Sequence, residues 1–501
     1  MEKRVGAISI ILTFLIFSIF AQDNDFQGGS WGEEVTEKSN LTSYDETFSL
    51  YGYLIDYIQS SLDYSNRKFT RPTFGNALLL RLKGDWRPEP NLHFHLEFSY
   101  ISNVGNQNPY VLYEKLGVAG FSQSDFPLED YHQRMFFDHV WGMANFGNFD
   151  LQFGKFPVAW GTGYVFNPTA RVAFPPFLDM VTEDTPGTMA ILPSYALSNR
   201  FSLEAYLAFQ DKTQKKTAFQ EDSDVKNLPY GIKLNTIAGS FDMSLSWIKE
   251  VLYNDLDYRP LDEILTESGM EYLQGIIANQ TLADLLVAGD TATALAMFKQ
   301  GALAAMTADL PAHPYYKRSY YAGFDFAGAI WDFGVYGEFA FCIPRDSNDE
   351  KFALKDYNLG DNLEMCLGFD YLIPGIEIDT RMEYYYQGIG AKSKKDYNLL
   401  TVLSGEKLVN ARNYSFLFLE KTVQNYHKFS LAFFNNLDDG SYALLPGYSY
   451  SPYNNFDITI GAFLLGGPRG SEFDGRYTLY DVKEIDLMEN LWPYLRLKIS
   501  F

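Results

Sequence analysis

The chain has 501 residues and a formal net charge of −23, and 17% of its residues are aromatic. Nucleic-acid binding needs clustered Lys and Arg, so this acidity argues against nucleic acid as a partner. The two cysteines, Cys342 and Cys366, are too few for a disulfide-rich scaffold or a four-cysteine metal site.

The amino terminus has the layout of an export signal. Lys3 and Arg4 precede an apolar run of 16 residues from Val5 to Phe20, and a polar, acidic stretch follows Ala21. This order predicts a signal peptide over residues 1–21. The alternative is a membrane-anchoring helix, for which the run is barely long enough. Cleavage would leave residues 22–47 as a periplasmic segment ahead of the first strand.

Alternating apolar and polar residues predict strands along most of the remaining chain. Each such run has the period of two of a strand with one apolar and one polar face. The predicted strands lie near 48–58, 74–86, 91–102, 132–144, 148–159, 185–194, 200–210, 228–238, 240–251, 317–329, 331–342, 361–373, 375–388, 411–421, 425–435, 441–451, 455–465 and 491–501. The count is 18, and 16 is the nearest alternative.

Short connections between these strands alternate with mostly much longer ones. The long set comprises residues 103–131, 160–184, 252–316, 343–360, 389–410 and 466–490. Soluble sandwiches do not sort loop length in this way, whereas outer-membrane barrels have short periplasmic turns and long outer loops. We therefore expect an all-β fold over residues 48–501, namely a transmembrane, antiparallel, up-and-down β-barrel.

Two histidines share a strand face with a carboxylate. His93, His95 and Glu97 alternate with apolar residues, and two His at this spacing could hold Zn²⁺. No third-ligand spacing is recognisable, and a wet barrel interior accounts for all three residues. We therefore predict no metal site and no cofactor. No motif of a known catalytic class supports an enzyme either.

The segment from Gly154 to Pro168 is rich in residues that set turns and close approaches. Gly161 and Gly163 permit close backbone contact, and Asn167-Pro168 predicts a turn. The connection 160–184 follows the fifth strand, where general porins fold a loop into the lumen. A constriction loop here would carry Trp160, Gly161, Asn167, Arg171, Asp179, Glu183 and Asp184. An outward loop packed on its own Phe and Pro residues is the alternative.

One outer connection contains a helical pattern. Between about 255 and 312, apolar residues such as Leu261, Ile264 and Leu265 recur at helical spacing. A small helical cap is the simpler interpretation of this insert, and a receptor-binding or pore-covering element is the alternative.

Charges at inward-facing positions separate along the chain. The early and final strands provide a basic arc of Arg81, Lys83, His93, His95, Arg134, Arg496 and Lys498. Strands nine to thirteen provide an acidic arc of Asp242, Asp325, Asp332, Glu338, Glu364, Asp370, Glu377, Asp379 and Glu383. Glu97 and Arg381 are exceptions within the opposite arcs. If the arcs line the pore, their charges produce a transverse field that favours polar solutes over apolar ones of equal size. Because the acidic groups outnumber the basic ones, small cations should also pass more readily than anions.

The last strand ends the chain on Phe501, with apolar residues at 495, 497, 499 and 501 and polar ones between them. This ending resembles bacterial outer-membrane β-barrels, whose closing strand ends in Phe and is read by the barrel-insertion machinery. Arg496 stands where such signals often have Gly. The Trp-Gly-x-Gly and Asn-Pro elements of residues 160–168 also look like those of porin and polysaccharide-export barrels.

These features favour a channel in the bacterial outer membrane for passive diffusion of small hydrophilic solutes or ions, because 16–18 strands enclose an aqueous lumen. The alternatives are a surface adhesin, using long acidic outer loops, and a polysaccharide-export conduit. The expected partners are outer-membrane lipid, the insertion machinery and small polar solutes. The oligomeric state is left open, and both cysteines are expected to be free thiols.

Overall fold

The conformation of the chain comes from a computed structural model. It describes residues 47–62, 64–65, 68–69, 72–105, 133–172, 184–209, 228–254, 315–343, 358–394, 397, 409–474, 476–479, 483–486 and 489–501. The expected signal peptide, most of the segment 22–47 and the helical insert at 255–312 lie outside these residues.

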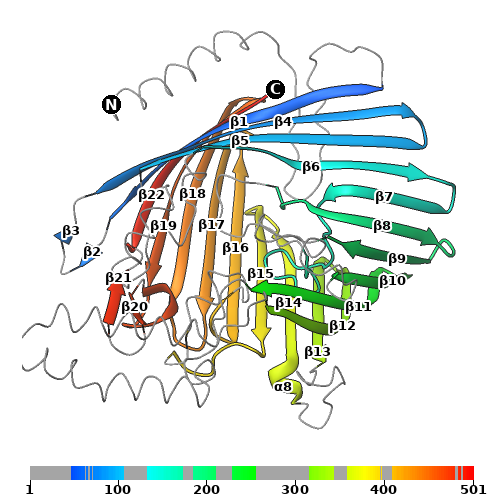
Figure 1. Cartoon of the computed structure of the whole chain (residues 1–501). Helices are drawn as coiled ribbons and strands as arrows, with labels where there is room; N and C mark the ends of the chain where they lie inside the picture. The colour runs from blue at the N-terminus through cyan, green and yellow to red at the C-terminus, as the bar shows by residue number, and fades with distance from the viewer. Residues whose placement is uncertain are drawn as a thin grey trace, which may run out of the picture.

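Eighteen strands form one antiparallel sheet that closes on itself (Figure 1). They are β1 (Phe48–Ser61), β4 (Thr73–Glu89), β5 (Leu92–Gly105), β6 (Gln133–Asn145), β7 (Phe149–Phe156), β8 (Thr188–Ala196), β9 (Phe201–Ala208), β10 (Tyr230–Ala238), β11 (Phe241–Asn254), β12 (Tyr315–Ile330), β13 (Phe333–Ile343), β14 (Leu363–Ile373), β15 (Ile378–Gln387), β16 (Asn413–Val423), β17 (His427–Asn436), β18 (Tyr442–Tyr453), β19 (Phe456–Gly466) and β22 (Leu491–Ser500). The predicted fold class and strand number are both confirmed.

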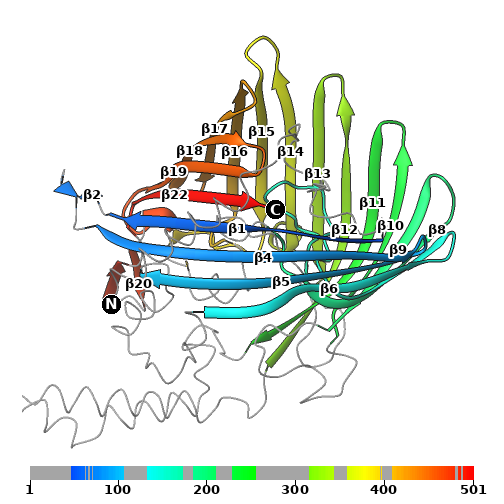
Figure 2. The same ribbon diagram turned by 90° about the horizontal axis from the view of Figure 1, so that it is seen from above.

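The ring closes where the two ends of the sheet meet (Figure 2). Strand β1 pairs with β4 on one side and with β22 on the other, and Tyr57 lies opposite Arg496. Backbone hydrogen bonds between Gly52 and Phe501 extend this pairing to the last residue, so the strand that ends the sequence also closes the barrel.

The two ends of the barrel differ in their connections. Eight connections at one end are tight turns, among them Gly239–Ser240, where Gly239 has φ +67°. Connections at the other end are longer, except for residues 437–441. They contain the hairpins β2 (Tyr64–Ser65) with β3 (Lys68–Phe69) and β20 (Arg476–Leu479) with β21 (Lys483–Asp486), the helix α8 (Leu359–Asn362) and the 3-10 turn η6 (Glu472–Asp474).

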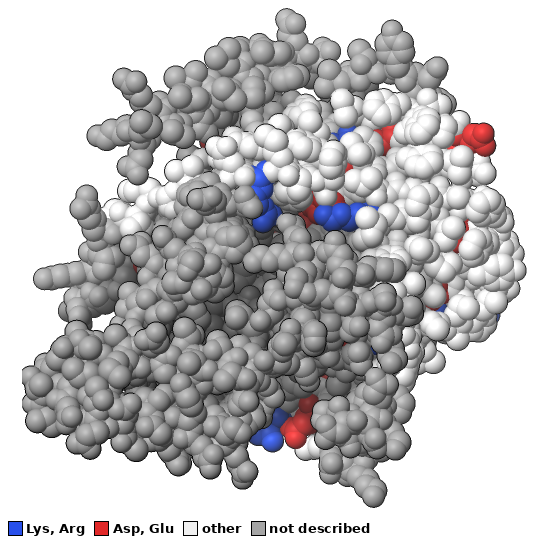
Figure 3. All heavy atoms as spheres, in the orientation of Figure 1, with Lys and Arg blue, Asp and Glu red and all other residues white. Residues whose placement is uncertain are grey.

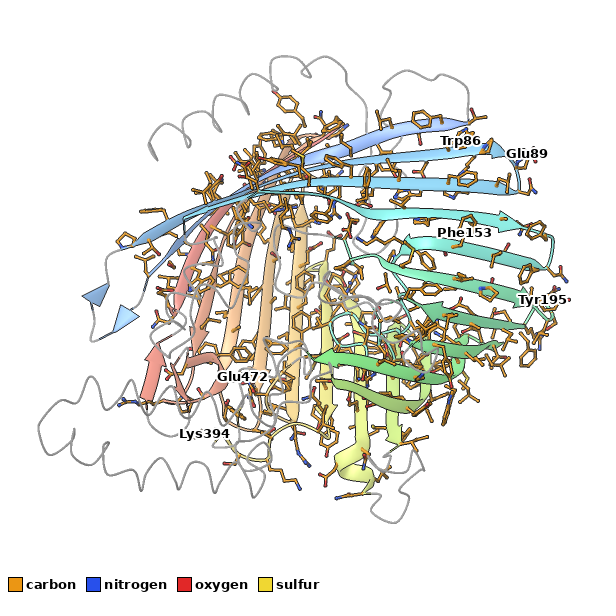
Figure 4. All side chains as sticks on the ribbon, in the orientation of Figure 1. Trp86, Glu89, Phe153, Tyr195, Lys394 and Glu472 are labelled. Carbon is orange, nitrogen blue, oxygen red and sulfur yellow. The ribbon has the colours of Figure 1, made fainter. Side chains whose placement is uncertain are left out.

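Apolar side chains cover the outer face of the ring. Leu96, Leu203 and Leu245, at the apolar positions of their strands, are exposed. Figure 3 shows few charges on the described surface over β6–β9. Exposed aromatic residues lie near the tight turns, as Figure 4 shows for Trp86 and Tyr195. Apolar strand faces bordered by such aromatics are the pattern of a barrel in a bilayer. Among the described residues, no helix has the length and hydropathy that a spanning helix needs.

Three clusters of buried residues pack against the inner face of the barrel wall. One centres on Phe156, Val158 and Trp160, a second on Phe166, Tyr385 and Tyr414, and the third on β1 and its neighbours β4 and β22. Two clusters include residues from the connection that follows β7, so this connection enters the barrel. Cys342 and Cys366 belong to these clusters, and both are free thiols, as expected.

Candidate functional site: a loop fixed across the lumen

The connection after β7 turns inward and reaches the far wall. Residues 157–172 of this connection contact β13 and β15. In the eighteen-strand ring, β15 is eight strands away from β7. The trace of these residues lies inside the ring of strands in both ribbon views (Figures 1 and 2). Because the opposite wall of such a ring is nine strands away, this segment spans almost the whole lumen.

Two carboxylates on the far wall hold the backbone of this segment. Glu338 on β13 accepts hydrogen bonds from the amides of Thr162 and Gly163, the latter at 2.7 Å. It also accepts from the amide and hydroxyl of Thr169, at 3.1 and 2.9 Å.

Glu383 on β15 holds the next three residues of the loop. It accepts from the amides of Tyr164, Val165 and Phe166, with distances of 3.0 Å for Val165 and 3.3 Å for Phe166. Five successive backbone amides, from residues 162–166, therefore point at two carboxylates. Successive amides in such a curved segment form an anion-binding concavity, here filled by side chains of the same protein.

The glycines of this segment have a steric role. A Cβ on Gly161 would lie 2.6 Å from Glu338 Oε1, and Gly161 has φ +112°, a conformation that favours glycine. A Cβ on Gly163 would lie 1.9 Å from the Phe166 carbonyl oxygen. Both positions therefore need glycine if the amides are to reach the carboxylates, which gives a physical reason for the Trp-Gly-x-Gly element.

Side chains fasten the same segment at three further points. The Trp160 indole donates to Glu204 on β9, and the Phe166 ring stacks on Tyr385 with a centroid distance of 4.2 Å. Arg171 donates to Glu364 on β14 at 2.6 Å. Trp160, Phe166 and Arg171 are all buried, so the loop is part of the packed interior.

The loop returns to the opposite side of the barrel before β8 begins. Asp184 lies between Arg81 and Lys83 of β4, at 3.1 Å from the Lys83 Nζ atom, and accepts from the Tyr53 hydroxyl at 2.9 Å. Lys83 and Arg81 hold the pKa of Asp184 below its usual range, against the raising effect of burial. The segment 157–172 is thus bonded to acidic residues of β13 to β15, and Asp184 is bonded to basic residues of β4.

No protein-family model matches the chain. No curated protein matches it either. Similar solved structures include OprB of Pseudomonas putida, at 11% identity over 91% of this chain and 94% of that one, with a TM-score of 0.40. They also include Wzi, an Escherichia coli outer-membrane protein involved in group 1 capsule assembly and a carbohydrate-binding β-barrel. It is 11% identical over 90% of this chain and 84% of that one, with a TM-score of 0.44.

A third similar structure is OmpF of Salmonella typhi in complex with daunomycin, at 7% identity over 91% of this chain and 97% of that one, with a TM-score of 0.36. The closed ring of eighteen antiparallel strands is observed directly in the strand pairing and does not depend on these similarities.

The basic residues of the barrel interior occupy neighbouring strands, but most of them have acidic partners. Arg81 is fully buried and contacts Glu97 at 2.8 Å and Asp138 at 3.1 Å, besides Asp184. His93 and His95 both contact Asp85. Arg134 is exposed and lies over the Phe136 ring. Arg496 and Lys498 are on β22, opposite Thr459 and Asp457 of β19.

The acidic residues lie on β11 to β15 and the turns between them. Most of those on the strands bond to the loop or pair with a basic side chain. Glu338, Glu364 and Glu383 bind the loop, and Asp325 contacts Lys233 at 3.3 Å. Asp379 lies 3.7 Å from Arg381, while Asp370 and Asp242 lie on β14 and β11. Asp332 and Glu377 differ: both are exposed in tight turns and are not on the lumen wall.

Of the constriction residues, Trp160, Gly161, Asn167 and Arg171 are in the inward segment and Asp184 is at its return. Asp179 and Glu183 lie outside the described residues. Sequence reasoning missed Glu204, Asp138 and His139, which complete these contacts. Asp138 and His139 both turn inward because a β-bulge at Asp138 interrupts the alternation of β6. The strand pattern alone gives no signal for that bulge.

Proposed function

We propose that this barrel is a channel for passive diffusion of small hydrophilic solutes or ions across the bacterial outer membrane, narrowed by the segment 157–172. The supporting observation is that two buried carboxylates hold five successive backbone amides of this segment across the lumen. A loop held inside a wide barrel restricts passage by size while leaving an aqueous path. Residues 1–21 would direct export as a signal peptide.

The test is to measure conductance while releasing the loop. Full-length protein in planar bilayers should give stable ion steps. The double variant Glu338→Gln, Glu383→Gln weakens the acceptors of the five amides without altering the outer face, so its conductance should rise. Asp370→Asn is the matched control, because Asp370 is on the intervening strand β14 and no bond to the loop is described for it.

Two results would contradict this proposal. If correctly folded barrels give no ion steps in either form, the surface adhesin becomes the better hypothesis. If both forms conduct equally, the channel would stand but the inward segment would not be its constriction.

A saccharide conduit is a second candidate, favoured by Tyr164. This residue of the inward segment is 38% exposed, with the rings of Phe416 and Phe418 at 6.0 Å and the Arg381 guanidinium 4.7 Å from its ring. An aromatic face beside a hydrogen-bond donor suits a sugar ring. Maltooligosaccharides should then block the current in wild type and in Tyr164→Phe, and much less in Tyr164→Ala. Equal block in all three would exclude Tyr164 as a sugar contact.

A further inference from the structure

A cluster of imidazoles and carboxylates on β5 and β6 is not required by the proposed channel. His95 and Glu97 come from β5, and His139 comes from β6 after the bulge. One ligand atom from each lies within 4.8 Å of the others. Glu97 is fully buried, and the two imidazoles are 10% exposed. The bulge brings in the third residue that the sequence pattern lacked.

Hydrogen bonds fix which nitrogen of each imidazole faces Glu97. His139 Nε2 lies 3.0 Å from the Thr185 carbonyl oxygen, which can only accept, so this nitrogen carries the proton. His95 Nδ1 lies 3.1 Å from Asp85 Oδ1, also an acceptor. The remaining nitrogens, His139 Nδ1 and His95 Nε2, face Glu97 Oε2 at 2.8 and 3.5 Å.

Two lone pairs and a carboxylate oxygen that point at one another repel unless a cation lies between them. That cation can be a metal ion or a proton on each imidazole. Imidazoles whose other nitrogen is held by a carboxylate or a carbonyl are the usual arrangement around protein-bound metals. Ligands about 2.0–2.2 Å from a tetrahedral Zn²⁺ lie roughly 3.3 Å apart, and the two distances here bracket that value.

The surrounding charges match a divalent cation. Arg81 and Lys83 contribute two positive charges from β4, at 2.8 Å from Glu97 Oε1 and 3.8 Å from Glu97 Oε2. Four carboxylates, Asp85, Glu97, Asp138 and Asp184, contact these cations or the imidazoles. Two positive and four negative charges leave a net charge of −2. Arg81 contacts Oε1 of Glu97 closely, whereas the Lys83 ammonium is 3.8 Å from Oε2, so Oε2 is the oxygen that could bind the metal.

We propose that His95, Glu97 and His139 form a binding site for a divalent transition-metal cation of the Zn²⁺ class in the barrel wall. Two imidazoles and one carboxylate are the donors that Zn²⁺ and its neighbours in the series prefer. Through the bond from His139 to Thr185, the cation would also steady the return of the loop beside Asp184.

The test uses full-length protein without a polyhistidine tag, folded in detergent micelles and stripped by a chelator. Titration calorimetry with ZnCl₂ should show one site, and Co²⁺ should give the visible bands of tetrahedral coordination. Loss of an outer hydrogen-bond partner weakens metal binding about 10–100-fold, so Asp85→Asn should fall in that range and His95→Ala or His139→Ala should lose at least as much. His427→Ala, on β17 and six strands away from β5 around the ring, should bind as wild type does.

Three results would overturn the proposal. One is the absence of any Zn²⁺ heat and any Co²⁺ bands in the folded wild type, which would mean that the imidazoles are protonated instead. Another is binding that survives both His95→Ala and His139→Ala. The third is equal loss in His427→Ala. For each variant, a difference in gel migration between unheated and heated samples shows that the barrel has folded.

Discussion

Glu472 is a buried carboxylate at the end of the barrel with the long connections, where Figure 4 shows it opposite the tight-turn end. Asn410 donates to it through its amide at 2.8 Å, and Asn436 through its side chain at 2.8 Å. The Tyr414 hydroxyl also donates to it, and the Glu472 amide donates to Asp439 at 2.9 Å. Glu472 thus joins three connections at this end to the ends of β16 and β17. Its side chain bonds Asn410, Tyr414 and Asn436, and its backbone amide bonds Asp439.

We predict that this joint is more stable in acid. Burial raises the pKa of Glu472, although Tyr414, Asn410 and Asn436 donate to the carboxylate. An unfolded Glu titrates near about 4.3, so the folded form holds its proton more tightly. The stability from this group is therefore complete below about pH 4.3 and is lost as pH rises through the folded value.

Thermal unfolding of wild type and Glu472→Gln at several pH values measures this effect. The wild-type midpoint should fall, relative to that of the variant, as pH rises above about 4.3. Glu89→Gln, at the tight-turn end, is the control and should follow wild type. Parallel curves for wild type and Glu472→Gln would show that this carboxyl does not contribute.

A second prediction at this scale concerns the lipid face. Leu96 is 46% exposed at the middle of β5, between the inward residues His95 and Glu97. Leu96→Arg should lower the free energy of unfolding by about 2–4 kcal/mol, because the guanidinium would lie in hydrocarbon. Leu96→Val should cost far less. Urea unfolding in phospholipid vesicles measures both, and equal costs would mean that this face does not contact lipid.

At the scale of elements, strands were predictable and the contacts between them were not. The period of two identifies β5 and the closing strand β22 from sequence because each has one apolar face. Which residue lies opposite another depends on register, and one bulge shifts every contact beyond it. Arg134 and His139 lie on opposite sides of the bulge in β6, so a single alternation of inward and outward positions cannot predict the facing of both.

The inward loop was predictable in place but not in mechanism. Glycines and the Asn-Pro pair indicate an unusual backbone at residues 161–168, yet nothing in the sequence says that Glu338 and Glu383 accept its amides. Those acids are more than 160 residues away, and they look like ordinary lumen charges. Asp332 and Glu377 have the same appearance in sequence but lie in turns, which only the ends of the strands reveal.

Gly163→Ala tests the geometry of the loop. The added Cβ would lie 1.9 Å from the Phe166 carbonyl oxygen, so the segment must shift and its amides should lose their carboxylates. Each buried acceptor left without a partner costs about 1–3 kcal/mol, and the conductance should rise as the loop loosens. Gly84→Ala is the matched control, since its nearest neighbours are side-chain atoms at 3.9 Å. A Gly163→Ala channel that conducts as wild type does would contradict the proposed packing.

At the scale of the whole molecule, the charges of the lumen remain sorted although many are paired. Arg81 and Lys83 share their positive charge with several carboxylates, whereas Glu338 and Glu383 are held by neutral amides. Acidic residues should therefore dominate the potential in the lumen, and low-dielectric walls focus such a potential.

We predict cation preference that depends on salt. Reversal potentials across a KCl gradient should favour K⁺ at low salt and approach neutrality in about 1 M KCl, where the Debye length is about 3 Å. Asp370→Asn with Asp379→Asn should reduce the preference, because each change removes an inward negative charge and no bond links either acid to the described residues of the loop. Anion preference at low salt, unchanged in that variant, would contradict the assignment of the acidic arc.

The carboxylates of β13 and β15 bond mainly to the backbone of the loop. This affects which substitutions in the loop the barrel can accept. Gly163 has no room for a Cβ, and Val165 and Phe166 are buried. At Thr162 and Tyr164, however, any residue type except proline presents the same backbone amide to Glu338 or Glu383, so these amide contacts do not depend on the two side chains. Those that project into the lumen, such as Tyr164, can therefore be exchanged while the frame stays in place. The residues that fix the path of the loop therefore differ from those that face the solute, and a new solute preference needs a change only in the latter.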